Sequence, residues 1–315
     1  MSALLHGITV AFLYLLNKLP LRLLYFISDF IYLIIYYVVG YRRKVVRGNM
    51  RKSFPEKSEV ELRKIEKEFY RNLCDYFVET IKYYGMSPEE LAKHIEFKGL
   101  DGLYKAIDNG RSCVCYMLHS FNWEFVTALP LFLNRENVVV GAVYHKLRNA
   151  RFNEIFKKMR AQYGADNVSM KNTLRHIIEI TRKKQLFVYG FMADQLPKVE
   201  AMNHWVTFLN QDTAVFTGAE KIACRTKSSV FNLALVKVAR GKYEATFELM
   251  FEDASQCAEN EVTNEYFRIS EELIRKYPAM WLWTHNRWKR GRASREAFEK
   301  RIADRHKALA ENASE

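Results

Sequence analysis

The chain has 315 residues, enough for one large domain or two small ones, and 49% of them are apolar, which establishes a buried core. Its net charge of +13 indicates an acidic partner: nucleic acid, an anionic membrane surface, a phosphorylated substrate or an acidic carrier protein. The five cysteines are odd in number and scattered, and no Cys or His pair has zinc spacing. We therefore expect a reducing compartment, no disulfides and no metal or other cofactor.

Two apolar segments begin the chain, residues 3–16 and Leu21–Val39, with a break at residues 17–20. The second is nearly long enough to cross a bilayer, but Asp29 would be costly at its centre. A single span, a re-entrant hairpin, an interfacial anchor and a helical hairpin packed on a soluble domain all stay open. The basic cluster that follows favours a cytoplasmic location beside anionic lipid headgroups; it comprises Arg42, Arg43, Lys44, Arg47, Arg51 and Lys52.

The rest of the chain alternates helical and strand patterns. Ser58 to Glu61 is a capping box before a long amphipathic helix that reaches Tyr84, and Pro88 begins a short one. Further helices are predicted at Gly99–Asn109, Asn149–Tyr163, Asn172–Arg182, Asp212–Cys224 and Glu261–Tyr277, and strands at Glu96–Lys98, Ser112–Leu118, Val138–Tyr144, Leu186–Gly190, Ser228–Val236 and Tyr243–Met250. This order predicts an α/β fold with a mostly parallel central sheet flanked by helices.

His119 follows the buried strand Ser112–Leu118, and a helical pattern that contains Glu124 begins directly after it. In open α/β sheets ligands bind at the carboxyl ends of the strands. A neutral imidazole there can accept a proton from a hydroxyl, and a carboxylate on its other nitrogen would fix the tautomer. The alternative is a solvated loop histidine and a glutamate placed for the helix dipole. The spacing alone does not decide between them.

Four blocks of sequence resemble the bacterial lipid A biosynthesis acyltransferases. His119-Ser120-Phe121-Asn122-Trp123-Glu124 is similar to that family's H-x-G-N-W-E corner, with Phe121 in place of the glycine. Residues 41–46 with 49–55, residues 208–210 with 217–223, and the segment from Trp281 to Lys289 resemble three further family blocks, in the family's order. Where the family usually has arginine-proline, this chain has His145-Lys146, so the preferred acyl chain and acceptor are open.

The resemblance implies a fold like that of the glycerolipid acyltransferases and the transfer of a fatty acyl chain from acyl carrier protein to a hydroxyl of a lipid A precursor. His119 would be the general base and Glu124 its partner. Asn122 is a candidate for binding the oxyanion, and Arg160, which matches a family pattern, for binding phosphate; a surface arginine is equally compatible. Asp194 and Gln195 resemble the family's D-Q pair and would line the site, or form a plain turn.

Domain boundaries follow from these assignments. We expect a membrane anchor over residues 1–40, an acyltransferase domain over 41–290 and a charged C-terminal helix or tail over 291–315, with the enzyme at the cytoplasmic face of the bacterial inner membrane. The alternative activities are acyl transfer to a lysophospholipid or an aminolipid, and a membrane-anchored binding protein without catalysis. Aromatic residues among arginines near Trp288 could bind nucleic acid, but they also suit a membrane interface, so we expect no nucleic-acid partner.

Overall fold

A seven-stranded sheet forms the centre of the protein. The computed structural model describes residues 13–147, 149–291, 294–300 and 303–304. In the order β1-β9-β8-β2-β5-β3-β4, every neighbouring pair of strands is parallel except β8 and β9. The strands are β1 (Ile95–Lys98), β2 (Cys113–Met117), β3 (Val138–Tyr144), β4 (Asp166–Ser169), β5 (Leu186–Met192), β8 (Ser229–Ala239) and β9 (Lys242–Phe251). The predicted fold class is confirmed.

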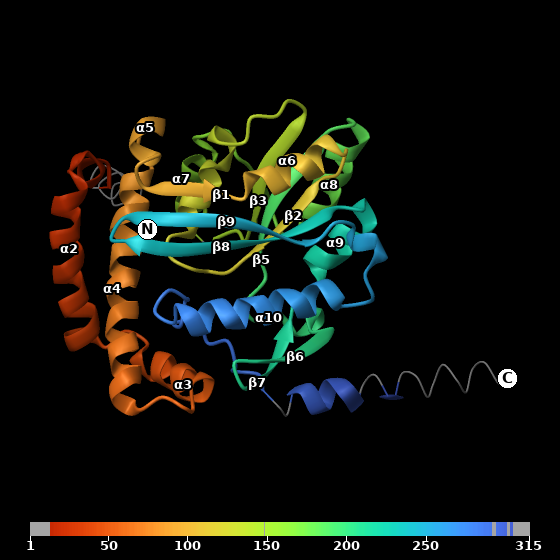
Figure 1. Ribbon diagram of the computed structural model, residues 1–315. Helices are drawn as coiled ribbons and strands as arrows, with labels where there is room; N and C mark the ends of the chain where they lie inside the picture. The colour runs from red at the N-terminus through yellow and green to blue at the C-terminus, as the bar shows by residue number, and fades with distance from the viewer. Residues whose placement is uncertain (1–12, 148, 292–293, 301–302, 305–315) are drawn as a thin grey trace.

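Helices connect and cover these strands. In Figure 1, α6 and α10 are drawn on opposite sides of the β8–β9 hairpin, and α2 and α4 run side by side at one end of the molecule. The capping box of α4 is present, since the Ser58 backbone N–H donates to Glu61 and the Glu61 N–H donates to the Ser58 hydroxyl. The α-helices are α2 (Leu21–Leu33), α3 (Arg43–Ser53), α4 (Glu59–Tyr83), α5 (Pro88–Leu91), α6 (Leu100–Asp108), α7 (Ala150–Ala161), α8 (Thr173–Arg182), α9 (Gly218–Thr226) and α10 (Glu261–Lys276).

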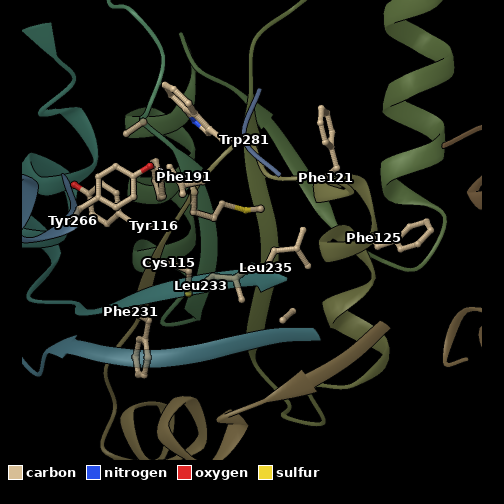
Figure 2. Packing of buried hydrophobic residues seen from close by; sticks show 14 of the residues in the cluster. Cys115, Tyr116, Phe121, Phe125, Phe191, Phe231, Leu233, Leu235, Tyr266 and Trp281 are labelled. Carbon is tan, nitrogen blue, oxygen red and sulfur yellow. Dashed lines mark hydrogen bonds between the residues drawn. The ribbon is translucent and has the colours of Figure 1, made fainter. Parts of the chain in front are cut away.

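The core lies between the sheet and these helices. All five residues of β2 are buried, as its uninterrupted apolar run predicts for a central parallel strand. Figure 2 shows the packing, with Cys115 of β2 near Leu233 of β8 and with Phe121 and Trp281 toward one end of the cluster. β3 differs from the prediction of a buried strand, because all seven of its residues are only partly buried.

One predicted helix is wrong at its start. Asp212–Cys224 was expected to be helical, but Gln211–Val215 is strand β7, which pairs with β6 (His204–Phe208), and α9 begins only at Gly218. The two-residue turn Leu209-Asn210 has positive φ at both positions, as tight hairpin turns require. Leu-Asn is a weak sequence pattern for such a turn, and hydrophobic periodicity alone does not predict the hairpin.

The apolar segment Leu21–Val39 is helical throughout. α2 continues through the π-helical turn η1 (Ile34–Val39), and this is the one described helix long and apolar enough to cross a membrane. Its inner face packs on α4, with Leu24, Ser28, Tyr32 and Tyr36 buried. The outer face exposes a stripe of large apolar side chains: Leu23, Phe26, Phe30, Leu33, Ile34 and Tyr37. The division of the chain at residues 40 and 290 stays a prediction.

Charged and polar side chains fasten α2 to the rest of the protein. The guanidinium of Arg240, from the β8–β9 turn, lies 2.7 Å from carboxylate oxygens of both Asp29 on α2 and Asp75 on α4. Ser28 donates a hydrogen bond of 2.8 Å to Asp75. The carboxylate of Asp29, which would be costly in a bilayer, is therefore paired within the protein. Specific contacts as well as apolar packing hold α2 to α4.

Glu79 of α4 is a fully buried carboxyl next to this cluster. Burial raises its pKa to about 7, although the hydroxyl of Tyr243 and the charge of Lys237 favour the ionised form; Asp75 adds to the rise. The folded protein therefore binds a proton at this site more tightly than the unfolded chain does. By linkage, Glu79 makes the protein less stable as the pH rises from about 4.5 through 7.

Glu79→Gln should remove this dependence, because an amide does not titrate. We expect the melting temperature of the variant minus that of the wild type to become more positive between pH 5 and pH 8, measured by calorimetry in a mild detergent. The other titrating groups are the same in both proteins, so their contributions cancel in the difference between the two melting temperatures at each pH. A difference that is the same at both pH values would contradict a raised pKa for Glu79.

Candidate active site

The register of β2 and β5 brings His119 and Asp194 together. Met117 and Met192, the last residues of the two strands, are paired in the parallel ladder, and His119 and Asp194 each stand two residues further on. Nδ1 of His119 lies 2.6 Å from Oδ1 of Asp194. The pair therefore forms at the carboxyl ends of neighbouring parallel strands, where α/β proteins bind their ligands.

Asp194 is buried, with 1% of its side chain exposed, and is held by three hydrogen bonds. Its Oδ2 accepts from the His119 backbone N–H at 3.2 Å and from Nε1 of Trp281 at 2.7 Å, while Oδ1 faces the imidazole. Burial alone would raise the pKa of Asp194, but the charge of His119 and these hydrogen bonds hold the pKa below its usual value. An ionised Asp194 keeps the proton of His119 on Nδ1, which leaves the lone pair of Nε2 for a ligand.

The segment that follows α10 packs against the His119–Asp194 pair. Ser120 and Trp281 form an antiparallel bridge, and the Leu282 N–H donates to the His119 carbonyl at 3.2 Å. Nε2 of His285 accepts from the Leu196 N–H, just after Asp194. Burial, together with the charge of Arg287, lowers the pKa of His285 to about 4, so His285 is neutral at pH 7 and suited to accept this bond. His285 therefore positions the loop after β5.

Glu124 has a different partner from the one expected. It lies in the first turn of the 3₁₀ helix η2 (Trp123–Leu131), is fully buried, and accepts two hydrogen bonds from Arg160 of α7, at 2.7 and 2.6 Å. Nε1 of Trp123 and the hydroxyl of Tyr76 also donate to it. The carboxylate on Nδ1 of His119 is that of Asp194, where the sequence suggested Glu124. Glu124 instead neutralises Arg160 and accepts from Trp123, whose ring is in edge-to-face contact with the imidazole of His119.

Asn122 is enclosed at the turn between His119 and Glu124. It is fully buried; its Oδ1 accepts from the Glu124 N–H at 3.2 Å, and its Nδ2 donates to Glu79 at 3.4 Å. Both ends of the amide thus have partners within the protein. These contacts give Asn122 the role of an N-cap for η2, and binding of an oxyanion by its side chain stays a prediction.

A mostly apolar cavity adjoins Glu124 and Arg160. It encloses about 600 Å³ of empty space, part of it continuous with solvent, and extends between η2, β2, β3 and β5. Gly141 of β3 and Gly190 of β5 line it, together with Met117, Val140 and Val188. The cavity contributes to the partial burial of β3, because residues 140–144 of this strand line it. Trp123 lines the cavity and also contacts His119, so the cavity reaches the imidazole's immediate surroundings.

The structure brings together the residues proposed from the sequence, but not with all of the expected contacts. His119, Asn122, Glu124, Arg160 and Asp194 do gather at the carboxyl ends of β2 and β5, and the half-buried Gln195 follows Asp194. The structural roles of Trp281 and Tyr76 were missed, because hydrogen bonds across long sequence distances leave no periodic pattern. Equal distances of His119 and Asp194 from their strand ends could have revealed the pair. Within the described residues, no group of three or more His, Cys, Asp or Glu side chains could hold a metal ion.

These features define a class of protein: an α/β enzyme with a histidine–carboxylate pair beside a cavity suited to an apolar chain. The sequence from residue 2 to residue 290 matches the family model of the bacterial lipid A biosynthesis acyltransferases. The chain therefore belongs to this family; it is an acyltransferase of lipid A biosynthesis, and the family implies a lipid A precursor as its substrate. No match to a curated protein was found.

The buried Glu124–Arg160 pair allows a stability test. Arg160→Met would leave Glu124 buried without its cation, which costs about 3–5 kcal/mol for such pairs. We expect a loss of that order in chemical unfolding, and a smaller loss for the double variant Glu124→Gln/Arg160→Met. The matched control is Arg51→Met, which breaks an equally forked but exposed pair with Glu59 and should cost far less, because water solvates both groups. Equal losses for Arg160→Met and Arg51→Met would contradict this account.

Proposed function

We propose that the enzyme transfers a fatty acyl chain from the thioester of acyl carrier protein to a hydroxyl of a lipid A precursor, with His119 as general base and Asp194 as its partner. The observation that supports this most is the 2.6 Å contact between Nδ1 of His119 and the buried Asp194, next to an apolar cavity. The proposal keeps His119 as the base inferred from the sequence. It gives Asp194 the role first expected of Glu124.

The reaction needs one base and no covalent enzyme intermediate. Nε2 of His119 removes the proton of the acceptor hydroxyl as the oxygen attacks the thioester carbonyl carbon, and a C–O bond forms. Asp194 stabilises the imidazolium that results. Collapse of the tetrahedral oxyanion breaks the C–S bond, and His119 returns the proton to the departing sulfur. Asp194 stays ionised throughout: burial opposes its charged form, but the charge of His119 and the hydrogen bonds from His119 and Trp281 outweigh this effect.

The cavity would hold the acyl chain of the donor. Its lining is apolar except near Glu124, Arg160, Thr127 and Asn167, and each methylene that leaves water for such a site gains about 0.8 kcal/mol. The Glu124–Arg160 pair lies in the wall near Trp123, where it would border the part of the chain closest to the thioester. This arrangement favours a role in shaping the cavity for Arg160 over binding of a phosphate, because its charge is already neutralised.

The exposed apolar face of α2 supports a membrane location. The apolar stripe on its outer face would lie in the bilayer, at the cytoplasmic face of the bacterial inner membrane, while Lys18, Arg22 and Lys44 are placed to meet anionic headgroups. The contacts of Asp29 and Ser28 keep the inner face of α2 on the domain. The substrate lipid would then reach the active site without leaving the membrane surface.

Acyl carrier protein is acidic, and a basic depression lies next to the loop that follows Asp194. Lys198, Lys289 and Arg290 line it together with His285. Opposite charges would steer the carrier to this side of the enzyme and raise the rate of association at low salt. We therefore assign the depression to the donor, close to the residues that position Asp194.

Mass spectrometry of lipid extracts tests the proposed activity. In a strain that lacks the native gene, the wild-type protein should add one secondary acyl chain to lipid A, and His119→Ala should not. With purified components, Asp194→Asn should lower kcat by about 10²–10⁴-fold, because the imidazole loses the carboxylate that orients and stabilises it.

The matched control is His176→Ala, since His176 also pairs with a carboxylate, Asp166, but outside the proposed site. It should leave acylation unchanged. If lipid A keeps its mass in every strain while a phospholipid or aminolipid gains a chain with the wild type, the acceptor is that lipid and the proposed substrate is wrong. Full activity of a folded His119→Ala variant would overturn the proposed base.

The length of the transferred chain tests the cavity. A β-carbon at Gly190 would make only ordinary contacts, 3.7 Å from Sδ of Met117 and 3.8 Å from Cβ of Ala142, so a side chain fits and fills the space. Gly190→Val should shift the preference toward shorter acyl donors, by about fourfold for each methylene displaced. Gly48→Ala, at a position with open space on α3, should leave the preference unchanged. The measurement is kcat/KM for a series of acyl-carrier-protein thioesters; the same preference in all three proteins would contradict the assignment.

A further inference from the structure

A buried chain of hydrogen bonds runs from α2 to the turn that follows His119. At its centre is Glu79 of α4, which has no exposed surface. Its Oε1 accepts from the hydroxyl of Tyr25 on α2 at 2.9 Å. Its Oε2 accepts from the hydroxyl of Tyr243 on β9 at 2.7 Å and from Nδ2 of Asn122 at 3.4 Å. One carboxyl thus joins the membrane-facing helix, the sheet and the candidate active site.

Asn122 transmits this contact to the site. Its Oδ1 accepts the Glu124 N–H, and its carbonyl accepts the Phe125 N–H, so Asn122 fixes the first turn of η2. That turn carries Trp123, which contacts the His119 ring, and Glu124, which holds Arg160. A shift of the Asn122 side chain would therefore move Trp123, which contacts the imidazole, and the neighbouring Glu124–Arg160 pair.

Contacts other than that of Glu79 also dock α2. Asp75, Arg240, Asp29 and Ser28 already join α2 to α4 and to the β8–β9 turn. A buried carboxyl is costly, and an apolar residue of similar shape is often at least as stable in such a position. The particular feature of Glu79 is that its two oxygens face opposite neighbours, α2 on one side and the turn after His119 on the other.

We propose that Glu79 is a positioning residue that couples the seating of α2 on α4 to the geometry of the turn at Asn122, so that acyl transfer is fast only when α2 is seated. This inference rests on the proposed function and adds a dependence of catalysis on the helix that faces the membrane. When α2 is displaced, Tyr25 no longer donates to Glu79. The Glu79 carboxyl then shifts relative to Asn122, and the orientation of Trp123 and Glu124 changes with it.

The experiment compares variants of the full chain in phosphatidylethanolamine–phosphatidylglycerol vesicles that contain the lipid A precursor, with lauroyl-acyl carrier protein as donor. Tyr25→Phe removes one hydroxyl, and Glu79→Leu removes the link. We expect each to lower kcat by about tenfold, the factor that corresponds to one buried hydrogen bond, with KM within about twofold of the wild type. Glu79→Gln should restore kcat, because its oxygen can accept from Tyr243 and Asn122 while its amide donates to Tyr25.

Ser28→Ala is the matched control. It removes a buried hydrogen bond between the same two helices, to Asp75, but lies outside the chain to Asn122. It should lower the melting temperature as Tyr25→Phe does and leave kcat unchanged. In addition, Tyr25→Phe should have no further effect on kcat in an Asn122→Ala background, since the link is already broken. Equal losses of kcat in Ser28→Ala and Tyr25→Phe, or additive losses in the double variant, would overturn the proposal.

Hydrogen exchange gives a readout that does not depend on acyl transfer. The amides of residues 123–125 should exchange about tenfold faster in Tyr25→Phe and Glu79→Leu than in Ser28→Ala. If the wild type transfers no acyl chain but this pattern appears, the proposed function fails and the coupling stands. If the wild type is active and these amides exchange equally in all variants, the coupling is wrong and the proposed function stands.

Discussion

The hydrogen bonds that converge on Asp194 join the parts of the chain on which the candidate active site depends. The carboxylate is buried, so each of its donors offsets a desolvation cost that would otherwise be large. Those donors come from the end of β2, through His119, and from the C-terminal segment, through Trp281. The loop after β5 is fixed in turn by His285. The Asp194 carboxylate thus holds the parts of the site together. The position of the His119 imidazole follows from the register of β2 and β5.

The sequence predicted the elements with local patterns well. The long α4 with its capping box, the central strand β2 and the β8–β9 hairpin all form close to their expected bounds. Strand β4 was missed because its four residues, Asp166–Ser169, include only one large apolar side chain, and β6 and β7 were missed or misassigned because the turn at Leu209-Asn210 has none of the usual glycine. A short edge strand forms because it pairs with residues that are distant in the sequence, and hydrophobic periodicity does not predict such pairing.

The site was predictable as a set of residues but not as a set of partners. Spacing along the chain suggested that Glu124 would meet His119, because the two are close in sequence and have complementary chemistry. The 3₁₀ turn that begins at Trp123 directs Glu124 toward α7 and Arg160 instead. Asp194 reaches Nδ1 because β2 and β5 are neighbours in the sheet, although β3 and β4 come between them in the chain. Strand order is a long-range property that one sequence does not determine.

Under the proposed function, the cavity between β3, β5 and η2 would also affect how the reaction ends. A chain that is bound there has exchanged water for an apolar lining, and release into water would reverse that gain, methylene by methylene. Release into a bilayer would not, since hydrocarbon is as good a solvent for the chain as the protein interior. An enzyme built in this way discharges its product rapidly only into lipid. The turnover of such an enzyme in dilute detergent would then be limited by departure of the product, while at a membrane it would be limited by chemistry or by arrival of the donor.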